Sequence, residues 1–203
     1  MLILSFDTAT DIATSALVRD GEVLGERVSR ASRVLADAEE LFAAAGCEPT
    51  ELDGIAVGTG PGSYTGLRMG LVTARALSLS LGVPVAGVST LSALARGAPG
   101  AVPVLDARRG EVFTLQDGAP LVLRPADLAV EPGARYVGDG AARYRQAIEG
   151  AGGEVPDDAS DLHVPWARHH AALATDFGPA ERAEPIYLRA PDARVFPAAP
   201  GRL

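Results

Sequence analysis

The chain contains no lysine: all eighteen of its cationic side chains are arginines. This absence excludes a P-loop lysine, a lysine that forms a Schiff base and a lysine general base. The 203 residues carry a formal net charge of -8, and an acidic chain has no long-range attraction for phosphate backbones, whereas tight RNA binding needs several clustered cations. We therefore expect no independent tight binding of RNA.

Cysteine and uninterrupted apolar runs are scarce as well. Cys47 is the single cysteine, so no internal disulfide can form and a reducing compartment fits. The longest apolar stretch, 71–95, is broken by Arg75, Gly82 and Pro84, which is typical of helix, turn and strand rather than of a membrane span. The N-terminal MLILSF has no basic flank and does not resemble a signal peptide. We expect a cytoplasmic protein without a membrane partner.

The first part of the chain, 1–97, has the pattern of a complete α/β lobe. The Asp20-Gly21 pair is typical of a two-residue hairpin turn between two strands. Apolar residues spaced three and four apart predict helices elsewhere. We expect strands over 2–6, 13–19, 22–29, 52–58 and 85–88, and helices over 30–45, 67–81 and from about 90 to 96. The predicted order is β-β-β-α-β-α-β-α.

The same pattern starts again after the glycines at 97–100. Both parts have the same order of elements, which is strand, aspartate turn, strand, Asp-Gly turn and strand. We therefore predict a degenerate internal duplication. Residues 98–190 would form a degenerate second lobe, and residues 191–203 a flexible tail. The expected elements of the second lobe are strands over 102–105, 111–116, 121–123 and 135–138, and helices over 141–150 and 166–177.

Aspartates occupy matching places in the two parts and are candidates for a degenerate phosphate site. Asp7, Thr8 and Thr10 lie in the turn after the first strand, and Asp106 ends the first strand of the second part. A turn of this kind can bind a nucleotide phosphate through hydroxyls and amides, while the aspartate orients magnesium-bound water. Asp and Thr are also good turn formers that hydrogen-bond their own backbone, and from these residues alone we favour this structural interpretation. We expect both aspartates to face a cleft between the lobes.

The segment 58–66, GTGPGSYTG, is the most unusual loop in the chain. It holds Gly58, Gly60, Gly62 and Gly66 between a strand and a helix. It is neither a Walker loop nor a GxGxxG fingerprint. Its glycines would let the backbone approach a ligand or another chain closely, beside the free amides of a helix N-terminus. We favour such a contact, with Ser63 included, over a purely structural turn.

The helix expected over 67–81 is apolar nearly all round, with Arg68 and Arg75 as its only charges. A helix of this kind must be covered on every side, and a sheet covers only one. The first helix offers an intramolecular cover, but we favour an interface with another subunit. The residues expected there are Leu35, Glu39, Phe42, Leu67, Gly70, Leu71, Ala74 and Leu77.

The residues suggest neither a catalytic constellation nor a metal site. His163, His169 and His170 fall late in the chain without an HExxH pattern or cysteine ligands, and we expect them on the surface. Ser63 does not have the spacing of a GxSxG elbow.

Five segments together resemble the TsaB (YeaZ) family: FDTAT at 6–10, GTGPGSYTGLRMG at 58–70, GVSTLSALA at 87–95, LDARRGEVF at 105–113 and PIYLR at 185–189. The resemblance implies an actin-like (ASKHA) duplicated α/β fold with a shortened second lobe. It also implies a non-catalytic subunit that acts with TsaD and TsaE in forming the threonylcarbamoyl group on the tRNA adenosine next to the anticodon.

The resemblance bears on ligands too. TsaD-like proteins hold a metal-binding HxxxH where this chain has Thr90 and Leu94, neither of which can supply an imidazole, so no metal and no cofactor beyond weakly bound ATP or ADP is expected. Alone, the chain is expected to form a homodimer. Two alternatives remain: an independent actin-like phosphotransferase or ATPase, and a homodimer with a purely structural role.

Overall fold

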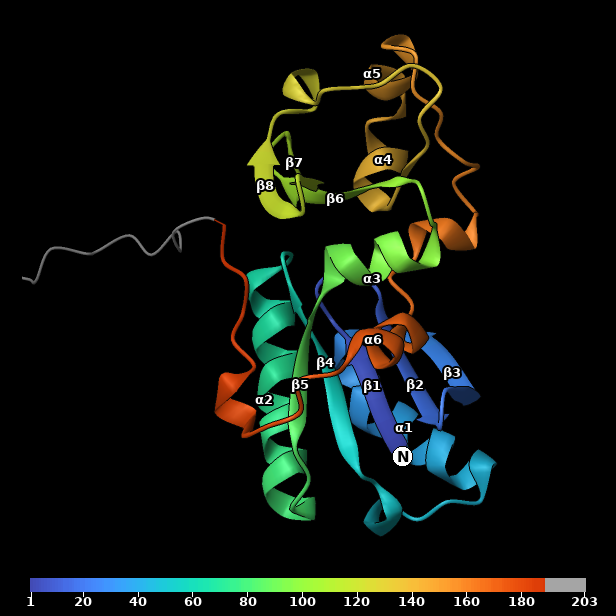
Figure 1. The fold of residues 1–203 in the computed structure, drawn as a ribbon, viewed down its shortest axis with the longest axis vertical. Coiled ribbons are helices and arrows are strands. Elements are labelled where there is room, and N and C mark those ends of the chain that lie inside the picture. Colours follow the sequence, from blue (N-terminus) through green and yellow to red (C-terminus); the bar gives the residue numbers. More distant parts are fainter. Residues whose placement is uncertain (189–203) are drawn as a thin grey trace, which may run out of the picture.

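The computed structural model describes residues 1–188 and places them in two sheets with a helix between them (Figure 1). The first sheet has the strand order β3-β2-β1-β4-β5. Its first three strands are antiparallel neighbours, whereas β1, β4 and β5 run parallel. The strands are β1 (Leu2–Asp7), β2 (Ala13–Arg19), β3 (Glu22–Ser29), β4 (Gly54–Gly60) and β5 (Val85–Ser89).

Two helices cover one face of the first sheet and enclose the main core. In β1 the alternate residues Leu2, Leu4 and Phe6 point into this core, as the period of two in a strand requires. The first helix ends at Gly46, whose φ of 62° is the left-handed conformation that favours glycine at a helix C-terminus. The helices are α1 (Val34–Ala45) and α2 (Tyr64–Leu81).

The second sheet has the order β8-β7-β6-β9 and is smaller. The predicted Asp-Gly hairpins are present in both sheets: Asp20, Gly21, Asp117 and Gly118 all have positive φ. Instead of one helix over 141–150, the chain forms two short helices interrupted at Tyr144. The elements are β6 (Val102–Arg108), β7 (Glu111–Gln116), β8 (Ala119–Leu123), β9 (Tyr136–Val137), α4 (Asp139–Arg143) and α5 (Arg145–Gly150).

The helix α3 (Thr90–Gly97) connects the two sheets and lies between them (Figure 1). Its apolar side chains Leu91 and Leu94 are buried with Leu105 and Phe113 of the second sheet. The junction predicted at residue 97 therefore falls at the end of this connecting helix.

The late helix α6 (Ala167–Leu173) packs on the first sheet, on the face opposite α1 and α2. Its Ala167 and Ala171 lie against Ala16 and Val18 of β2. The assignment of all of 98–190 to the second lobe is therefore wrong for α6, because the chain returns to the first sheet. The helix also ends at Leu173, before the predicted 177. The tail expected over 191–203 lies outside the described residues.

Within residues 1–188, no helix is both long enough and apolar enough to cross a membrane.

Candidate functional site

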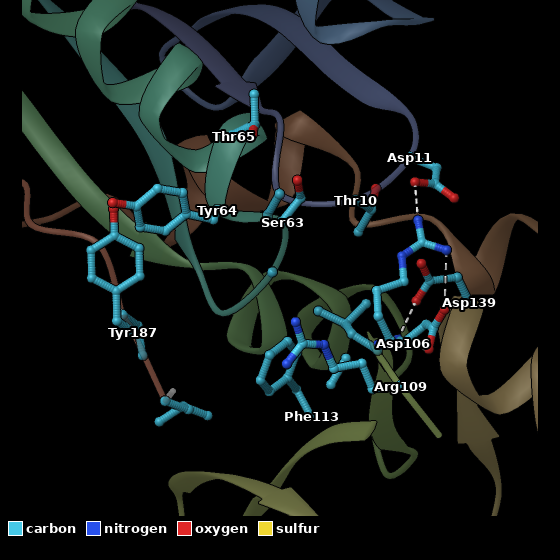
Figure 2. Close-up of a pocket in the computed structure, with 17 residues that line it drawn as sticks. Thr10, Asp11, Ser63, Tyr64, Thr65, Asp106, Arg109, Phe113, Asp139 and Tyr187 are labelled. Carbon is cyan, nitrogen blue, oxygen red and sulfur yellow. Dashed lines mark hydrogen bonds and ion pairs between the residues drawn. The ribbon is translucent and has the colours of Figure 1, made fainter. Parts of the chain in front are cut away.

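A pocket of about 610 Å³ lies between the two sheets (Figure 2). The first sheet contributes Thr10 and Asp11 from the turn after β1, and the loop before α2 contributes Gly62 and Ser63. From the second sheet and its surroundings come Asp106, Arg108, Arg109, Phe113 and Asp139, and residues 186–188 complete the lining. In Figure 2, Tyr64 and Tyr187 lie on one side of the pocket and the carboxylates on the other.

An ion pair joins the two turns that face each other across this pocket. The Arg108 guanidinium of the second sheet contacts the Asp11 carboxylate of the first. It also pairs at 3.3 Å with Asp106, whose carboxylate lies 3.4 Å from Arg143. The charges of the two turns thus largely satisfy one another.

Asp139 is a further, partly buried carboxyl of the pocket. Its Oδ1 accepts a hydrogen bond of 2.9 Å from the Asp106 amide. Burial raises the pKa of Asp139 above its usual value; this hydrogen bond opposes the shift, while the nearby Asp106 charge adds to it. Asp106 and Asp139 form an acidic side of the pocket, which suits a polar ligand. In this structure their carboxylates contact Arg108, Arg143 and the Asp106 amide.

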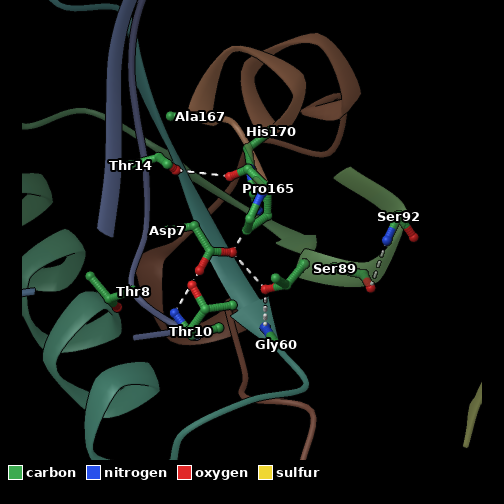
Figure 3. Close-up of polar contacts among 12 residues, drawn as sticks. Asp7, Thr8, Thr10, Thr14, Gly60, Ser89, Ser92, Pro165, Ala167 and His170 are labelled. Atoms are coloured by element: carbon green, nitrogen blue, oxygen red, sulfur yellow. Dashed lines mark hydrogen bonds and ion pairs between the residues drawn. The ribbon is translucent and has the colours of Figure 1, made fainter. Parts of the chain in front are cut away.

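Asp7 does not line the pocket, contrary to the prediction that it faces the cleft. It lies at the end of β1, only 1% exposed, on the face covered by α6 (Figure 3). Its Oδ1 accepts from the Ala9 amide at 2.6 Å, and its Oδ2 from the Thr90 hydroxyl at 2.6 Å. The Nε2 atom of His170 lies 2.7 Å from Oδ2, at the distance of an ion pair but without the direction of a regular N–H hydrogen bond. Asp7 is therefore committed to internal contacts.

The surroundings of Asp7 favour its charged form. Burial alone would raise the pKa of Asp7, but the charge and contact of His170, followed by the hydrogen bonds from Thr90 and Ala9, outweigh it. The net result is a pKa below the usual value of an aspartate.

The expectation that all three histidines lie on the surface is wrong. His170 is fully buried against Asp7, and His163 is buried with its Nε2 3.1 Å from the Pro156 carbonyl. His169 is half-buried against Gly97, and burial, assisted by Arg168, lowers its pKa to about 4. In the sequence, the only sign that His170 has a role is that it forms a histidine pair on a predicted helix. Its contact with Asp7 depends on tertiary packing.

The glycine-rich loop packs directly on the turn that follows β1. A Cβ on Gly58, Gly62 or Gly66 would overlap with Asp7, Ala9 or Thr8, respectively. The Ser63 amide donates to the Ala9 carbonyl at 2.7 Å, and the Thr8 hydroxyl donates to the Gly66 carbonyl at 2.7 Å. These contacts account for the glycines by packing within the chain, whereas the sequence favoured a contact with a ligand or another chain. Thr8, Gly58, Gly60 and Gly66 do not line the pocket, whereas Thr10, Gly62, Ser63 and Asp106 do.

The face of α2 expected to meet a partner is turned inward. Within the chain, Leu67, Gly70, Leu71 and Ala74 are buried, as is Phe42 of α1. For these five residues the interface prediction is wrong, because their phase on the helix directs them to the sheet. Leu35 and Glu39 are exposed, and Leu77 is partly buried.

The outer face of α2 is nevertheless apolar, as its composition predicted. Met69, Val72 and Leu79 are 39%, 63% and 88% exposed, and Ala76 is exposed between them. Their spacing of three, four and three residues places them in one stripe along the helix. We call these four residues the outer stripe of α2.

An aromatic cluster lies at the N-terminal end of α2. The rings of Tyr64 and Tyr187 have centroids 5.2 Å apart, and the Arg68 guanidinium lies 4.0 Å from the centre of the Tyr64 ring. Arg68 Nε also donates to the Tyr187 hydroxyl at 3.3 Å. Tyr64 and Tyr187 line the pocket, while Arg68 is exposed on α2.

Two sheets of this topology with a pocket between them define an actin-like α/β protein, and comparisons with known proteins agree. The model of the TsaD family, tRNA N6-adenosine threonylcarbamoyltransferase, matches residues 13–133. A solved structure of YeaZ from Pseudomonas aeruginosa superimposes with a TM-score of 0.76 and 29% identity, over 92% of this chain and 99% of that one.

Two protein relatives narrow the assignment. An uncharacterized protein of Mycobacterium tuberculosis is 36% identical over 95% of this chain and 93% of its own length. TsaB of Escherichia coli, a tRNA threonylcarbamoyladenosine biosynthesis protein, is 41% identical over 56% of this chain and 53% of its own length. The chain belongs to the TsaB (YeaZ) family.

Proposed function

We propose that the chain acts in forming threonylcarbamoyladenosine on tRNA, as a non-catalytic subunit that docks a TsaD-like catalytic subunit. The names of the TsaB relatives and the match to the TsaD model support a role in this pathway. The observation that carries the docking role is the outer stripe of α2.

The outer stripe leaves large apolar side chains in water. Removing a side chain such as Val72 or Leu79 from water gains about 1.5–3 kcal/mol. A stripe spaced along one helix suits a second helix packed against it. A TsaD-like partner, whose family model matches the segment of this chain that includes α2, can supply an equivalent helix. Without that partner, a second copy of the chain would cover the stripe and form a homodimer.

Two features support a role without chemistry of its own. Asp7, the residue best placed by sequence for a phosphate site, is held by His170 and Thr90. Thr90 and Leu94 are both buried and neither provides an imidazole ligand. We propose that catalysis and any metal belong to the TsaD-like subunit, that a TsaE-like ATPase completes the machinery, and that nucleotide binding by this chain is weak.

The outer stripe is tested by Val72→Arg. Because Val72 points outward, folding should be nearly unchanged, whereas an unpaired guanidinium buried in the interface should weaken association at least about a hundredfold. Affinity for the TsaD-like subunit is measured by calorimetry, alongside a thermal melt and a tRNA modification assay. The matched control is Gln146→Arg, at an exposed helical position of α5.

Loss of both the complex and the modification, with an unchanged melt, supports docking as the function. Wild-type affinity in folded Val72→Arg would show that another face meets the partner. Normal modification without a complex would reject the docking function itself.

A further inference from the structure

The PIYLR segment has no role in the function proposed above, yet its residues 186–188 contact three separate parts of the molecule. The Ile186 amide donates to the Thr59 carbonyl at the end of β4, at 2.8 Å. Tyr187 stacks on Tyr64 of α2, and Leu188 packs against the core cluster beneath the second sheet. We call residues 186–188 the strap.

The strap is the end of a longer segment that runs beside α2 (Figure 1). Gly178 pairs with Val85 at the edge of the first sheet, and Arg75 of α2 donates to the Ala183 carbonyl at 3.2 Å. The segment then crosses from the first sheet to the second along one side of the pocket. Its position consequently depends on how the two sheets are placed relative to each other.

The strap also contacts the end of the surface proposed for docking. Arg68 both covers the Tyr64 ring and donates to the Tyr187 hydroxyl, and it is followed by Met69, the first residue of the outer stripe. Tyr64 and Tyr187 are 39% and 40% exposed, so this end of α2 is accessible to a partner. Tyrosine and arginine are among the residue types enriched at the positions that dominate the binding energy of interfaces.

We propose that the strap couples the placement of the two sheets to the partner-docking end of α2, an inference that rests on the docking function proposed above. With Leu188 seated in the second-sheet cluster, Tyr187 holds Tyr64 and Arg68 in the docking conformation. When the sheets separate, Leu188 withdraws, the aromatic cluster loosens and the partner binds more weakly. A ligand that enters the pocket and contacts Tyr64 or Tyr187 would act on the same equilibrium.

The decisive variant is Leu188→Ala, because Leu188 packs toward the second sheet and lies outside the outer stripe. We expect hydrogen exchange in the isolated chain to increase at the Ile186 amide and at the amides of 66–71. The affinity for the TsaD-like subunit should fall about fivefold or more, the range that loss of one aromatic contact would give. Glu184→Ala, an exposed change in the same segment, should alter neither quantity.

Tyr187→Ala is the second variant, because it leaves the second-sheet cluster intact. It should also give faster hydrogen exchange and weaker affinity for the TsaD-like subunit, so the test does not depend on Leu188→Ala folding. Faster exchange without weaker binding, or weaker binding without faster exchange, would overturn the coupling. Unchanged exchange and affinity in both variants would overturn it too. If Val72→Arg abolishes binding while the strap variants bind normally, docking stands and only the coupling is rejected. Wild-type binding by Val72→Arg rejects the docking face instead.

Discussion

At the scale of single residues, the pair of Asp7 and His170 is a buried contact between distant parts of the chain. Both side chains are buried, with exposures of 1% and 0%, and the pair joins β1 to a helix from the far end of the chain. Breaking a buried pair by removing one partner leaves the other charge uncompensated, which costs more than the pair contributes relative to apolar residues. Asp7 therefore secures α6 on the first sheet.

We expect Asp7→Asn to lower the free energy of unfolding by about 3 kcal/mol at pH 7, because the paired charge is lost. Since the folded-state pKa of Asp7 lies below its ordinary value of 3.8, the folded protein binds fewer protons there than the unfolded chain. The stability due to Asp7 is therefore complete well above pH 3.8 and is lost as the pH falls through the folded pKa. Urea titrations from pH 7 to pH 3 should show the variant and the wild type converging at the acid end.

Asp176→Asn is the matched control, because Asp176 pairs with Arg182 at the surface, where both side chains are more than half exposed. It should change stability by less than about 1 kcal/mol. The role given to Asp7 would be contradicted if wild type and Asp7→Asn differed little in free energy of unfolding at pH 7. It would also be contradicted if this difference in free energy grew as the pH falls.

At the scale of elements, the glycine-rich loop and the turn after β1 behave as one packed unit. A Cβ on Gly58, Gly62 or Gly66 would overlap with this turn, so glycine at these positions lets the two segments pack closely. This packing also brings the N-terminus of α2 to the pocket. The loop therefore positions the site through packing within the chain.

Gly58→Ala should lower the free energy of unfolding by about 2 kcal/mol or more, because its Cβ would overlap with the Asp7 carboxylate and force buried groups apart. The measurement is chemical denaturation followed by circular dichroism. Gly150→Ala is the control: a Cβ there meets no atom within 4 Å, and its φ is not positive. It should be neutral or slightly stabilising. Equal effects of the two substitutions on the free energy of unfolding would mean that the close approach at Gly58 does not contribute to stability.

At the scale of the whole molecule, the contact between the two sheets bears on nucleotide binding. The Asp11–Arg108 ion pair joins the facing turns, and Asp7 is unavailable behind them. A triphosphate with magnesium would have to displace the ion pair and find a ligand to replace Asp7. We expect calorimetry to give a Kd for magnesium ATP weaker than about 1 mM, which corresponds to about -4 kcal/mol.

Arg108→Ala, which removes the ion pair, serves as the comparison for that titration. It should not convert the chain into a tight ATP binder, because Asp7 remains held by His170 and Thr90. Micromolar ATP binding by the wild type would contradict this account and favour the actin-like phosphotransferase alternative.

Much of the fold followed from local signals in the sequence. The Asp-Gly pairs determined two hairpins because their turn geometry needs positive φ, and the spacing of apolar residues determined α1, α2 and α3. The glycine loop and its neighbours also sufficed to indicate the family. The duplication of the two parts remains a prediction from the sequence pattern.

Other features were decided by tertiary structure alone. The sequence of α2 is apolar on all sides, so it could not say that Leu67 and Ala74 face inward while Val72 and Leu79 face outward. Nor could it place His170 against Asp7, or give the glycines their partners in the turn after β1. Local structure depends on residues within a few positions of each other, and the sequence displays them directly. Burial and pairing depend on segments far apart in the chain, whose relative position is set only when the sheets and helices pack.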